Sequence, residues 1–293
     1  MTANPSISKA AFWMGCSLTC TLLMTISGRE TTRELNVFQV MEMRSVLGLV
    51  LLYPLVRHAG GFRAMRTQRI GMQATRNFAH YLGQFAWLAA LTLIPLAQLV
   101  AIEFTAPIWT AIMAVAFLGE RMTVWKALAI ALGLVGVVVI VRPGLESVSV
   151  GQLLVLFAAV SFAISFVATK SLTRTDSVVA IIFWMLVIQS IFGLVPAIMV
   201  WQTPTASVLP WILLISFGGS YAHFCIAKAL ANADATVVVP MDFLRVPATA
   251  LLGWLVYSEA IDWMTVAGTV LILCGNLLNL VGRQPAGGQV PNP

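Results

Sequence analysis

The feature that most limits how this chain can fold is an internal duplication with an offset of about 139 residues. The block Val100–Gly136 aligns with Val239–Gly275, so that Glu103 falls on Asp242. Each block closes one half of the chain, and each half holds five apolar segments. A repeat with an odd number of membrane crossings must place its two copies upside down relative to one another. This inverted layout is typical of carriers that work by alternating access around a central site.

The composition places the whole chain in a membrane. Hydrophobic residues make up 59% of its 293 residues and charged residues 10%, with a mean hydropathy of +0.92, whereas a soluble domain carries about 25% charged residues. Apolar runs long enough to cross about 30 Å of hydrocarbon as a helix recur throughout. We expect ten such helices, at residues 10–28, 37–57, 72–93, 96–118, 124–141, 151–170, 178–201, 209–230, 236–257 and 263–281.

The predicted fold is therefore an all-α integral membrane protein with ten transmembrane helices, arranged as two inverted five-helix repeats around a central cavity. The first repeat is expected at residues 1–143 and the second at 144–283, followed by a disordered tail at 284–293. Small residues such as Ala129 and Gly133 allow close helix packing, either within the chain or between two copies. A monomer is expected, with a dimer as the alternative.

The distribution of positive charge predicts the orientation of the chain. When the ten segments are traced, 11 of the 17 Lys and Arg residues fall on the same side as the amino terminus. Inner-membrane proteins show this bias, with the basic loops in the cytoplasm. We therefore expect a multi-pass protein of a bacterial inner membrane with both termini in the cytoplasm. The basic cluster Arg57–Arg69 is interpreted as an orientation signal. Nucleic-acid binding is not expected, because stacking aromatic residues are not interleaved with the cluster.

No metal, cofactor or catalytic residue is expected. The four cysteines lie inside apolar segments without a CxxC pair, and a metal site would need more ligands of the right type nearby. They are Cys16, Cys20, Cys225 and Cys274. The sequence has no phosphate-binding loop, which agrees with an absence of ATP hydrolysis. A membrane-embedded enzyme is disfavoured, because His80 and His223 lie on different segments and form no HExxH motif.

The end of each half carries a pattern that resembles a known family. The first reads PIWTAIMAVAFLGERMTVWKALAIALGLVGVVVIV, and the second reads ALANADATVVVPMDFLRVPATALLGWLVYSEAIDWMTVAGTVLILCG. Together with Arg44 in the second segment, these patterns resemble the drug/metabolite transporter (DMT) superfamily, and specifically its EamA-type members. The resemblance covers essentially the whole chain, although the seventh segment has no arginine that matches Arg44. It implies ten helices in two inverted repeats and secondary transport of small organic solutes without ATP.

Ionisable residues inside the predicted segments are candidates for the transport site, because charge in hydrocarbon usually faces a cavity or an opposite charge. The eight such residues are Glu42, Arg44, Arg76, His80, Glu103, His223, Asp242 and Arg245. With three carboxylates against three arginines, purely structural ion pairing remains open for each of them.

The third segment carries a polar stripe. Arg76, His80, Gln84 and Trp87 follow one another at helical steps of about four, four and three residues. Such a stripe fits the wall of a watery cavity. His80 is placed either to relay protons, since its pKa lies near physiological pH, or to pack as a hydrogen-bonded core residue.

The duplicated block supplies a second candidate cluster. Glu103 and Asp242 occupy matching positions in the two halves, and Arg245 lies three residues after Asp242 on the same helix face. The two carboxylates are candidates to bind a substrate ammonium or to carry a proton. Neutralising nearby arginines is the alternative.

The full set of candidates for substrate binding or ion coupling is Arg76, His80, Tyr81, Gln84, Trp87, Glu103, Trp109, His223, Asp242 and Arg245. Deep aromatic residues and paired charges suit an amphipathic zwitterion, so amino acids, including aromatic ones, are the expected substrates. Export follows the tendency of the family, with a coupled proton as the candidate driving ion. The alternatives are import of a vitamin or nucleoside-like metabolite and export of organic cations. Among other classes, a passive channel remains open.

Overall fold

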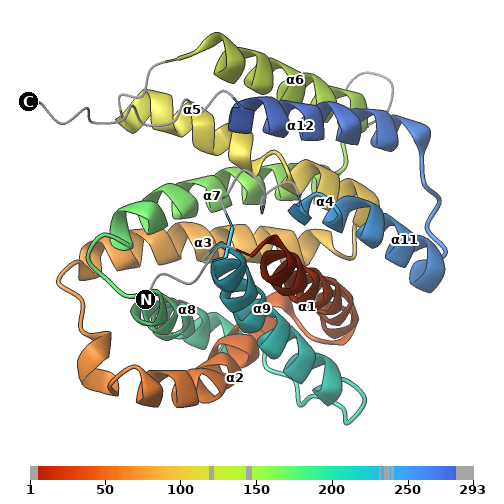
Figure 1. Ribbon diagram of the computed structural model, residues 1–293. Helices are drawn as coiled ribbons and strands as arrows, with labels where there is room; N and C mark the ends of the chain where they lie inside the picture. The colour runs from red at the N-terminus through yellow and green to blue at the C-terminus, as the bar shows by residue number, and fades with distance from the viewer. Residues whose placement is uncertain are drawn as a thin grey trace, which may run out of the picture.

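The computed structural model describes residues 6–118, 122–142, 147–230, 232–233, 238 and 241–281, without the side chains of a few of them, His223 included. All regular structure within these residues is helical. The elements are α1 (Ile7–Glu34), α2 (Val37–His58), the short 3₁₀ helix η1 (Phe62–Met65), α3 (Ile70–Ala90), α4 (Leu96–Glu103), α5 (Ala106–Leu118), α6 (Val124–Val141), α7 (Val150–Leu172), α8 (Val178–Met199), α9 (Leu209–Leu230), α11 (Arg245–Tyr257) and α12 (Trp263–Val281). Figure 1 shows how they are arranged. The tail predicted at 284–293 lies outside the described residues.

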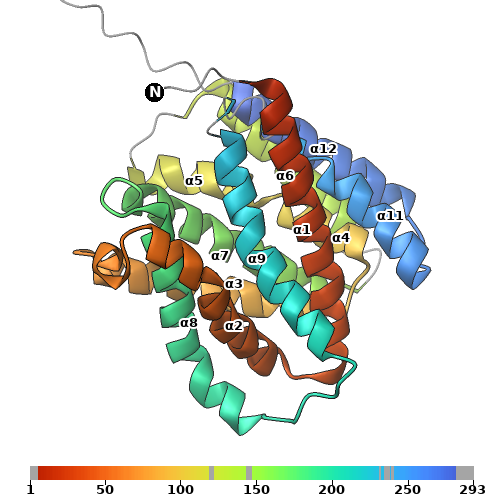
Figure 2. The same cartoon turned by 60° about the horizontal axis from the view of Figure 1, so that its bottom comes forward.

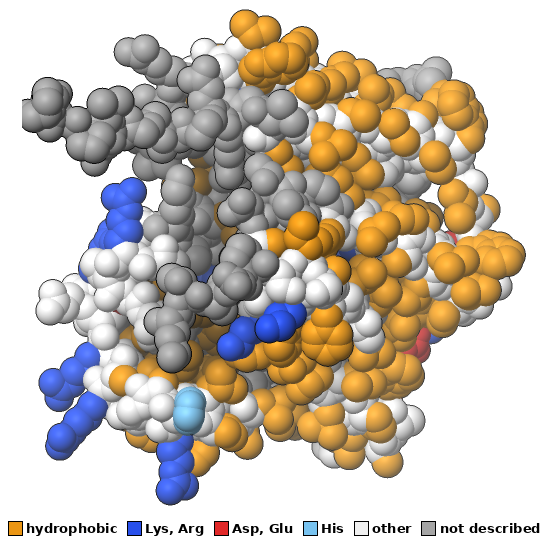
Figure 3. Space-filling view, in the orientation of Figure 1, with side chains coloured by type: hydrophobic (Ala, Val, Ile, Leu, Met, Phe, Trp, Pro, Cys, Tyr) orange, Lys and Arg blue, Asp and Glu red, His pale blue; other side chains and the backbone are white. Residues whose placement is uncertain are grey.

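Eight helical segments of the described chain are long and apolar enough to cross a membrane. They are Ile7–Glu34, Val37–His58, Leu96–Met113, Val124–Val141, Val150–Thr169, Val178–Met199, Leu209–Ile226 and Trp263–Leu280. Helix α3 is not among them, because its buried face carries Gln73, Arg76 and Asn77. In Figure 3 apolar side chains cover much of the visible face, whereas Lys and Arg gather along one side of it. These features indicate a multi-pass membrane protein.

Four antiparallel helix pairs make up most of the molecule. Helix α1 packs against α9, α3 against α7, α2 against α8, and α6 against α12. The pairs can be followed in Figures 1 and 2. In the predicted repeat, α1 corresponds to α7, α2 to α8, α3 to α9 and α6 to α12. The counterpart of the α1–α9 pair is therefore the α7–α3 pair. The α2–α8 and α6–α12 pairs map onto themselves, and all four pairs join a helix of the first half to a helix of the second.

Helices α6 and α12 approach so closely that their contact leaves no room for side chains. A Cβ atom on Gly136 would lie 2.7 Å from the carbonyl oxygen of Gly268. One on Gly275 would lie 2.7 Å from the carbonyl oxygen of Ala129. These two contacts are counterparts in the duplication, because Gly136 corresponds to Gly275 and Ala129 to Gly268. The small-residue packing expected around Ala129 is therefore used within the chain.

A helix break in each half interrupts a predicted segment. Residues 104–105 form a turn between α4 and α5, and residues 243–244 form a turn before α11. In the first turn the amide of Thr105 donates to the carbonyl of Ile102 at 3.0 Å, and in the second the amide of Leu244 donates to that of Met241 at 3.3 Å. Both pairs of residues are related by the same offset as the aligned blocks.

Prolines explain why both segments break at these points. Pro107 and Pro247 follow the turns, and proline has no amide hydrogen to bond the carbonyl four residues earlier. A neighbouring helix satisfies one carbonyl freed by the first break, because Asn276 of α12 donates to Phe104 at 2.9 Å. The sequence predicts single helical segments at 96–118 and 236–257, and the structure corrects both, because each is interrupted by a turn. The breaks place acidic residues at helix ends inside the bundle.

One end of the bundle, named here the Glu259 end, is held by ion pairs between the halves. Glu259, just after α11, pairs with Arg29 of α1 and accepts a hydrogen bond from the Leu96 amide at the start of α4 at 2.8 Å. Beyond them, Arg142 after α6 pairs with Asp262 before α12. These contacts draw α1, α4, α6, α11 and α12 together at this end.

The opposite end is held by hydrogen bonds from the start of α3 and the segment before it to the end of α7 and the α7–α8 connection. Thr67 and Gln73 donate to Asp176 at 2.7 and 2.8 Å, and Arg69 donates to Ser171 at 2.8 Å. Burial raises the pKa of Asp176, but these hydrogen bonds and the nearby Arg69 charge outweigh burial and hold the pKa below its ordinary value. The Asp176 carboxylate is therefore a stable acceptor at neutral pH.

The glycine contact between α6 and α12 yields the first prediction. We expect Gly136→Ala to lower the free energy of unfolding by about 1–3 kcal/mol, because the added methyl group must push two backbones apart. The matched control is Gly15→Ala, whose Cβ would meet nothing within 4 Å; it should be neutral or stabilising by up to about 1 kcal/mol. Unfolding in detergent micelles measures both, and equal effects would contradict the close contact.

Candidate functional site

A cavity of about 300 Å³ lies at the centre of the bundle, among α1, α2, α3, α4, α7, α8, α9 and the break before α11. Its volume is at the lower end of the range of about 300–1,000 Å³ found for small-molecule sites. Aromatic and aliphatic side chains form most of the wall. The charged and strongly polar residues that line it are Arg44, His80, Gln84, Glu103, Asp242 and Arg245.

One pole of the cavity, named here the carboxylate cluster, consists of Glu103, Asp242 and Arg245. The Arg245 guanidinium donates to Glu103 Oε1 at 2.8 Å and lies 3.8 Å from Asp242 Oδ2. The second oxygen of Glu103 accepts a hydrogen bond from the indole of Trp87 at 2.8 Å. Two carboxylates thus share one arginine, and the cluster carries a net negative charge. Asp242 has the loosest contact, and its side chain is the most exposed of the three at 29%.

The helix breaks position the carboxylate cluster. Glu103 is the last residue of α4 and Arg245 the first of α11, so both side chains leave from helix ends inside the bundle. Phe104 and Phe243, which lie in the two breaks, meet edge to face at 5.7 Å. The Arg245 guanidinium lies 4.6 Å from the centre of the Phe104 ring, a cation–π contact that helps to hold it.

The other pole, named here the Arg44 cluster, consists of Arg44, Gln84, Gln189 and His80. Arg44 of α2 donates to Gln84 at 2.6 Å and to Gln189 at 3.2 Å, and the Gln189 amide lies 2.9 Å from His80 Nδ1. Both recorded partners of Arg44 within the described residues are neutral. The arginine therefore presents an uncompensated positive charge to the cavity.

The two poles give the cavity its chemistry. A net negative charge at one place and a positive charge at another complement a molecule that carries both charges. Trp87, Phe162 and Phe166 add aromatic surface to the cavity lining. Within the described residues no group of His, Cys, Asp and Glu could hold a metal ion. The lining thus combines groups of opposite charge with apolar surface.

Six of the ten residues predicted from the sequence line this cavity. They are His80, Gln84, Trp87, Glu103, Asp242 and Arg245. Arg76 shares the α3 stripe but lies outside the cavity lining, where it donates to Thr169 at 3.1 Å and to Asn77 at 2.7 Å.

The remaining three predicted residues lie elsewhere. Tyr81 is buried outside the cavity lining. Trp109 donates its indole N–H to Thr105 at 3.1 Å, beside the first helix break. His223 belongs to α9, but its side chain lies outside the described part of the chain.

Sequence reasoning left several lining residues out of the site. Arg44 was counted among the ionisable residues inside the predicted segments and as a match to the family, but it was not among the ten candidates for substrate binding or ion coupling. Thr21, Ser216 and Ser220 also line the cavity. Hydroxyl groups in membrane helices usually bond their own backbone, so their type and spacing give no signal of a site.

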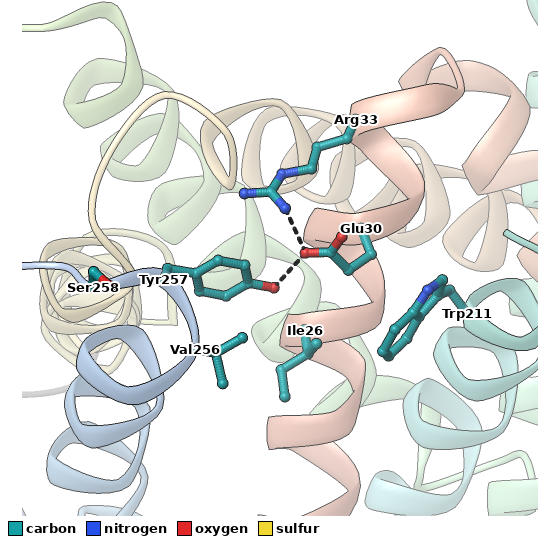
Figure 4. A pocket seen from close by; sticks show the side chains of 7 residues that line it. All are labelled: Ile26, Glu30, Arg33, Trp211, Val256, Tyr257 and Ser258. Carbon is teal, nitrogen blue, oxygen red and sulfur yellow. Dashed lines mark hydrogen bonds and ion pairs between the residues drawn. The ribbon is translucent and has the colours of Figure 1, made fainter. Parts of the chain in front are cut away.

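A second hollow of about 460 Å³ lies at the Glu259 end, lined by Ile26, Glu30, Arg33, Trp211, Val256, Tyr257 and Ser258. Figure 4 shows the Glu30 carboxylate between the Arg33 guanidinium and the Tyr257 hydroxyl. It accepts hydrogen bonds from Arg33 and Tyr257, both at 2.8 Å. The charges of Glu30 and Arg33 are thus paired with each other. The hydrogen bond from Tyr257 to Glu30 holds α11 against α1.

Comparisons with known proteins identify the kind of molecule. The model of the EamA-like transporter family matches twice, at residues 8–142 and 149–281. An S-adenosylmethionine uptake transporter of Rickettsia prowazekii is 25% identical over 265 residues, covering 90% of each chain. A riboflavin transporter of Brucella anthropi is 32% identical over 248 residues, covering 83% of this chain and 86% of that protein.

Two further matches widen the comparison. A pseudopaline exporter of Pseudomonas aeruginosa is 28% identical over 253 residues, covering 84% of this chain and 86% of that protein. A solved crystal structure shares the fold with a TM-score of 0.64 at 15% identity, covering 94% of this chain and 98% of the other.

The shared arginine yields the second prediction. We expect Arg245→Gln to lower the free energy of unfolding by about 3 kcal/mol, because it leaves Glu103, whose side chain is only 14% exposed, without its cation. The double variant Arg245→Gln/Glu103→Gln should be more stable than Arg245→Gln alone, since the uncompensated charge is gone. Unfolding of the wild type, the single variants Arg245→Gln and Glu103→Gln, and the double variant in detergent measures the coupling, and purely additive effects would show that the pair does not interact.

Proposed function

Because the chain belongs to the EamA-like transporter family, we propose that it carries small zwitterionic solutes, amino acids first among them, through the central cavity by alternating access. Membership of the family confirms the expectation that the protein is a multi-pass membrane transporter and not an enzyme. The observation that carries the proposal is the pair of opposite poles in one cavity.

The proposed substrate contacts follow from the charge of each pole. The Arg44 guanidinium, with only neutral partners recorded in the described chain, binds the substrate carboxylate. Asp242, which is held loosely by Arg245, receives the ammonium group. Charge-assisted hydrogen bonds of this kind are about twice as strong as neutral ones. The aromatic side chain of a substrate then lies against Trp87 and Phe162.

A second candidate class is the nucleoside-like or vitamin-like metabolite. It is favoured by similarity to proteins named as S-adenosylmethionine and riboflavin transporters. S-Adenosylmethionine is itself an α-amino acid with an added cationic sulfur, so the same two poles suit it. The relatives are named for uptake as well as for export, and export therefore stays part of the proposal on the tendency of the family alone.

The proposed architecture is a pair of inverted five-helix repeats, residues 1–143 and 144–283. Four findings support it: the family model matches each half, the helix breaks share the offset of the duplication, the helix pairs are exchanged between halves, and the α6–α12 glycine contacts are exchanged as well. In this proposal the relative movement of the two halves exposes the cavity to one side of the membrane at a time.

The proposed orientation puts the Glu259 end outside the cell. The ion pairs there join α1 and α6 of the first half to α11 and α12 of the second, so they close this end in the present conformation. The excess of Lys and Arg predicted on the amino-terminal side supports a cytoplasmic position for both termini. A bacterial inner membrane and a monomeric carrier complete the proposal.

Counterflow in liposomes tests the proposed function. Purified protein is reconstituted with unlabelled solute inside, and the entry of trace labelled solute is followed for phenylalanine, S-adenosylmethionine, riboflavin and tetraphenylphosphonium. We expect saturable counterflow of phenylalanine, because the cavity complements a zwitterion with an apolar group. Counterflow of S-adenosylmethionine or riboflavin alone would favour the second class, and flux that does not saturate would indicate a channel.

The two poles are tested separately in the same assay. We expect Asp242→Asn and Arg44→Gln each to raise the half-saturating concentration about tenfold or more, since each removes a charged contact that contributes about 1.5–3 kcal/mol. Glu34→Gln is the matched control, because Glu34 bonds Thr205 outside the cavity. An unchanged concentration in both variants would contradict the proposed contacts.

A further inference from the structure

A buried carboxyl group lies outside the cavity, between the two halves. Glu42 of α2 is only 6% exposed and faces Gly193 of α8. A Cβ atom on Gly193 would lie 2.6 Å from Glu42 Oε2 and 3.3 Å from the hydroxyl of Tyr81 of α3. The glycine therefore makes room for both groups, and Glu42 and Tyr81 converge on one point of the α2–α8 contact.

The polar atoms at this point lack partners. Three buried polar atoms have no hydrogen-bond partner within the described residues: Glu42 Oε2, the Tyr81 hydroxyl and the Ser190 hydroxyl. Ser190 faces Glu42 but in a geometry short of a hydrogen bond. No ion pair of Glu42 occurs in the described part of the chain, whereas Glu103 and Glu259 each have an arginine.

This environment disfavours an ionised carboxylate. A charge moved from water into an apolar interior is strongly destabilised unless a countercharge or several hydrogen bonds compensate it. Glu42 has neither among the described residues. In this conformation the environment therefore favours the neutral form of the Glu42 carboxyl group, which carries one proton.

The surroundings of Glu42 connect it to the cavity. The Tyr81 hydroxyl interacts electrostatically with both Glu42 and Arg44, and Arg44 lines the cavity. Within the described residues, the titratable groups of this region include Tyr81 and His80 of α3 and Arg44 of α2. The Gln189 amide lies 2.9 Å from His80 Nδ1, and Arg44 is hydrogen-bonded to Gln84 and Gln189. Substrate binding at Arg44 changes the charge next to the Tyr81–Glu42 pair.

We infer that Glu42 is the proton-binding site that couples transport to a proton gradient, separate from the substrate cavity. Glu42 holds its proton while α2 and α8 are packed together. When the halves move, water reaches the carboxyl group, its O–H bond breaks, and the proton passes to that water and leaves a carboxylate. One proton moves in each cycle. The inference rests on the proposed transport function.

The experiment compares Glu42→Gln with the wild-type protein in liposomes, using the solute that shows counterflow. A pH difference of one unit coupled to one proton can sustain about tenfold accumulation. We expect accumulation approaching this value for the wild type and none for Glu42→Gln, whose counterflow stays within about twofold of normal because the amide mimics the neutral acid. Glu34→Gln is the control and should keep both activities, and Glu42→Asp, which retains an acid, should keep coupling.

Gradient-driven accumulation by Glu42→Gln would overturn the inference, and so would a wild-type protein that exchanges solute without responding to the gradient. A second measurement needs no substrate. Infrared spectra at neutral pH should show the carbonyl stretch of a protonated carboxylic acid that disappears in Glu42→Gln, and identical spectra would also overturn the inference. Absence of counterflow in the wild type would instead contradict the proposed function and leave the infrared result to decide on Glu42.

Discussion

The arrangement of the cavity depends on one arginine placed between two carboxylates in an apolar interior. An isolated charge is costly inside a membrane protein, so Glu103 and Asp242 need a partner. Arg245 contacts both and is held over Phe104. Because Glu103 and Arg245 lie at the ends of helices, the two breaks, the α4–α11 approach and this ion cluster require one another. A continuous helix at either place would turn one of these groups away.

The cluster also shows why a duplicated chain can build a polarised site. Glu103 and Asp242 are counterparts in the two halves, but the counterpart of Arg245 is Ala106. If both halves carried the arginine, the cluster would be neutral, with two acids and two arginines. If neither did, the two acids would have no countercharge. With a single arginine the cluster is net negative. Arg44, which has no matching arginine in the seventh segment, places a positive charge at another part of the cavity lining. The departures from the repeat thus generate the two poles that suit a zwitterion.

How far the sequence predicts this structure varies with the kind of interaction. Apolar length locates most helices, because hydrophobic segments in a bilayer must form them. The stripe of His80, Gln84 and Trp87 was predictable, since helical spacing fixes which side chains share a face. Arg76 continues that stripe yet lies beyond the cavity, because the extent of a hollow depends on neighbouring helices. Trp109 looked similar to Trp87 in the sequence; only the tertiary fold directs one indole to Glu103 and the other to Thr105.

Two acids inside the bundle, Glu103 and Glu42, illustrate how the environment distinguishes identical side chains. Glu103 has an arginine and an indole as partners, one on each oxygen of its carboxylate. Glu42 lies between the halves with unsatisfied oxygens around it, so its neutral form is favoured. Two carboxyl groups of one protein can take different roles because their environments differ. In the proposed mechanism, this division separates the proton site from the substrate site, so that proton and substrate do not compete for the same carboxylate.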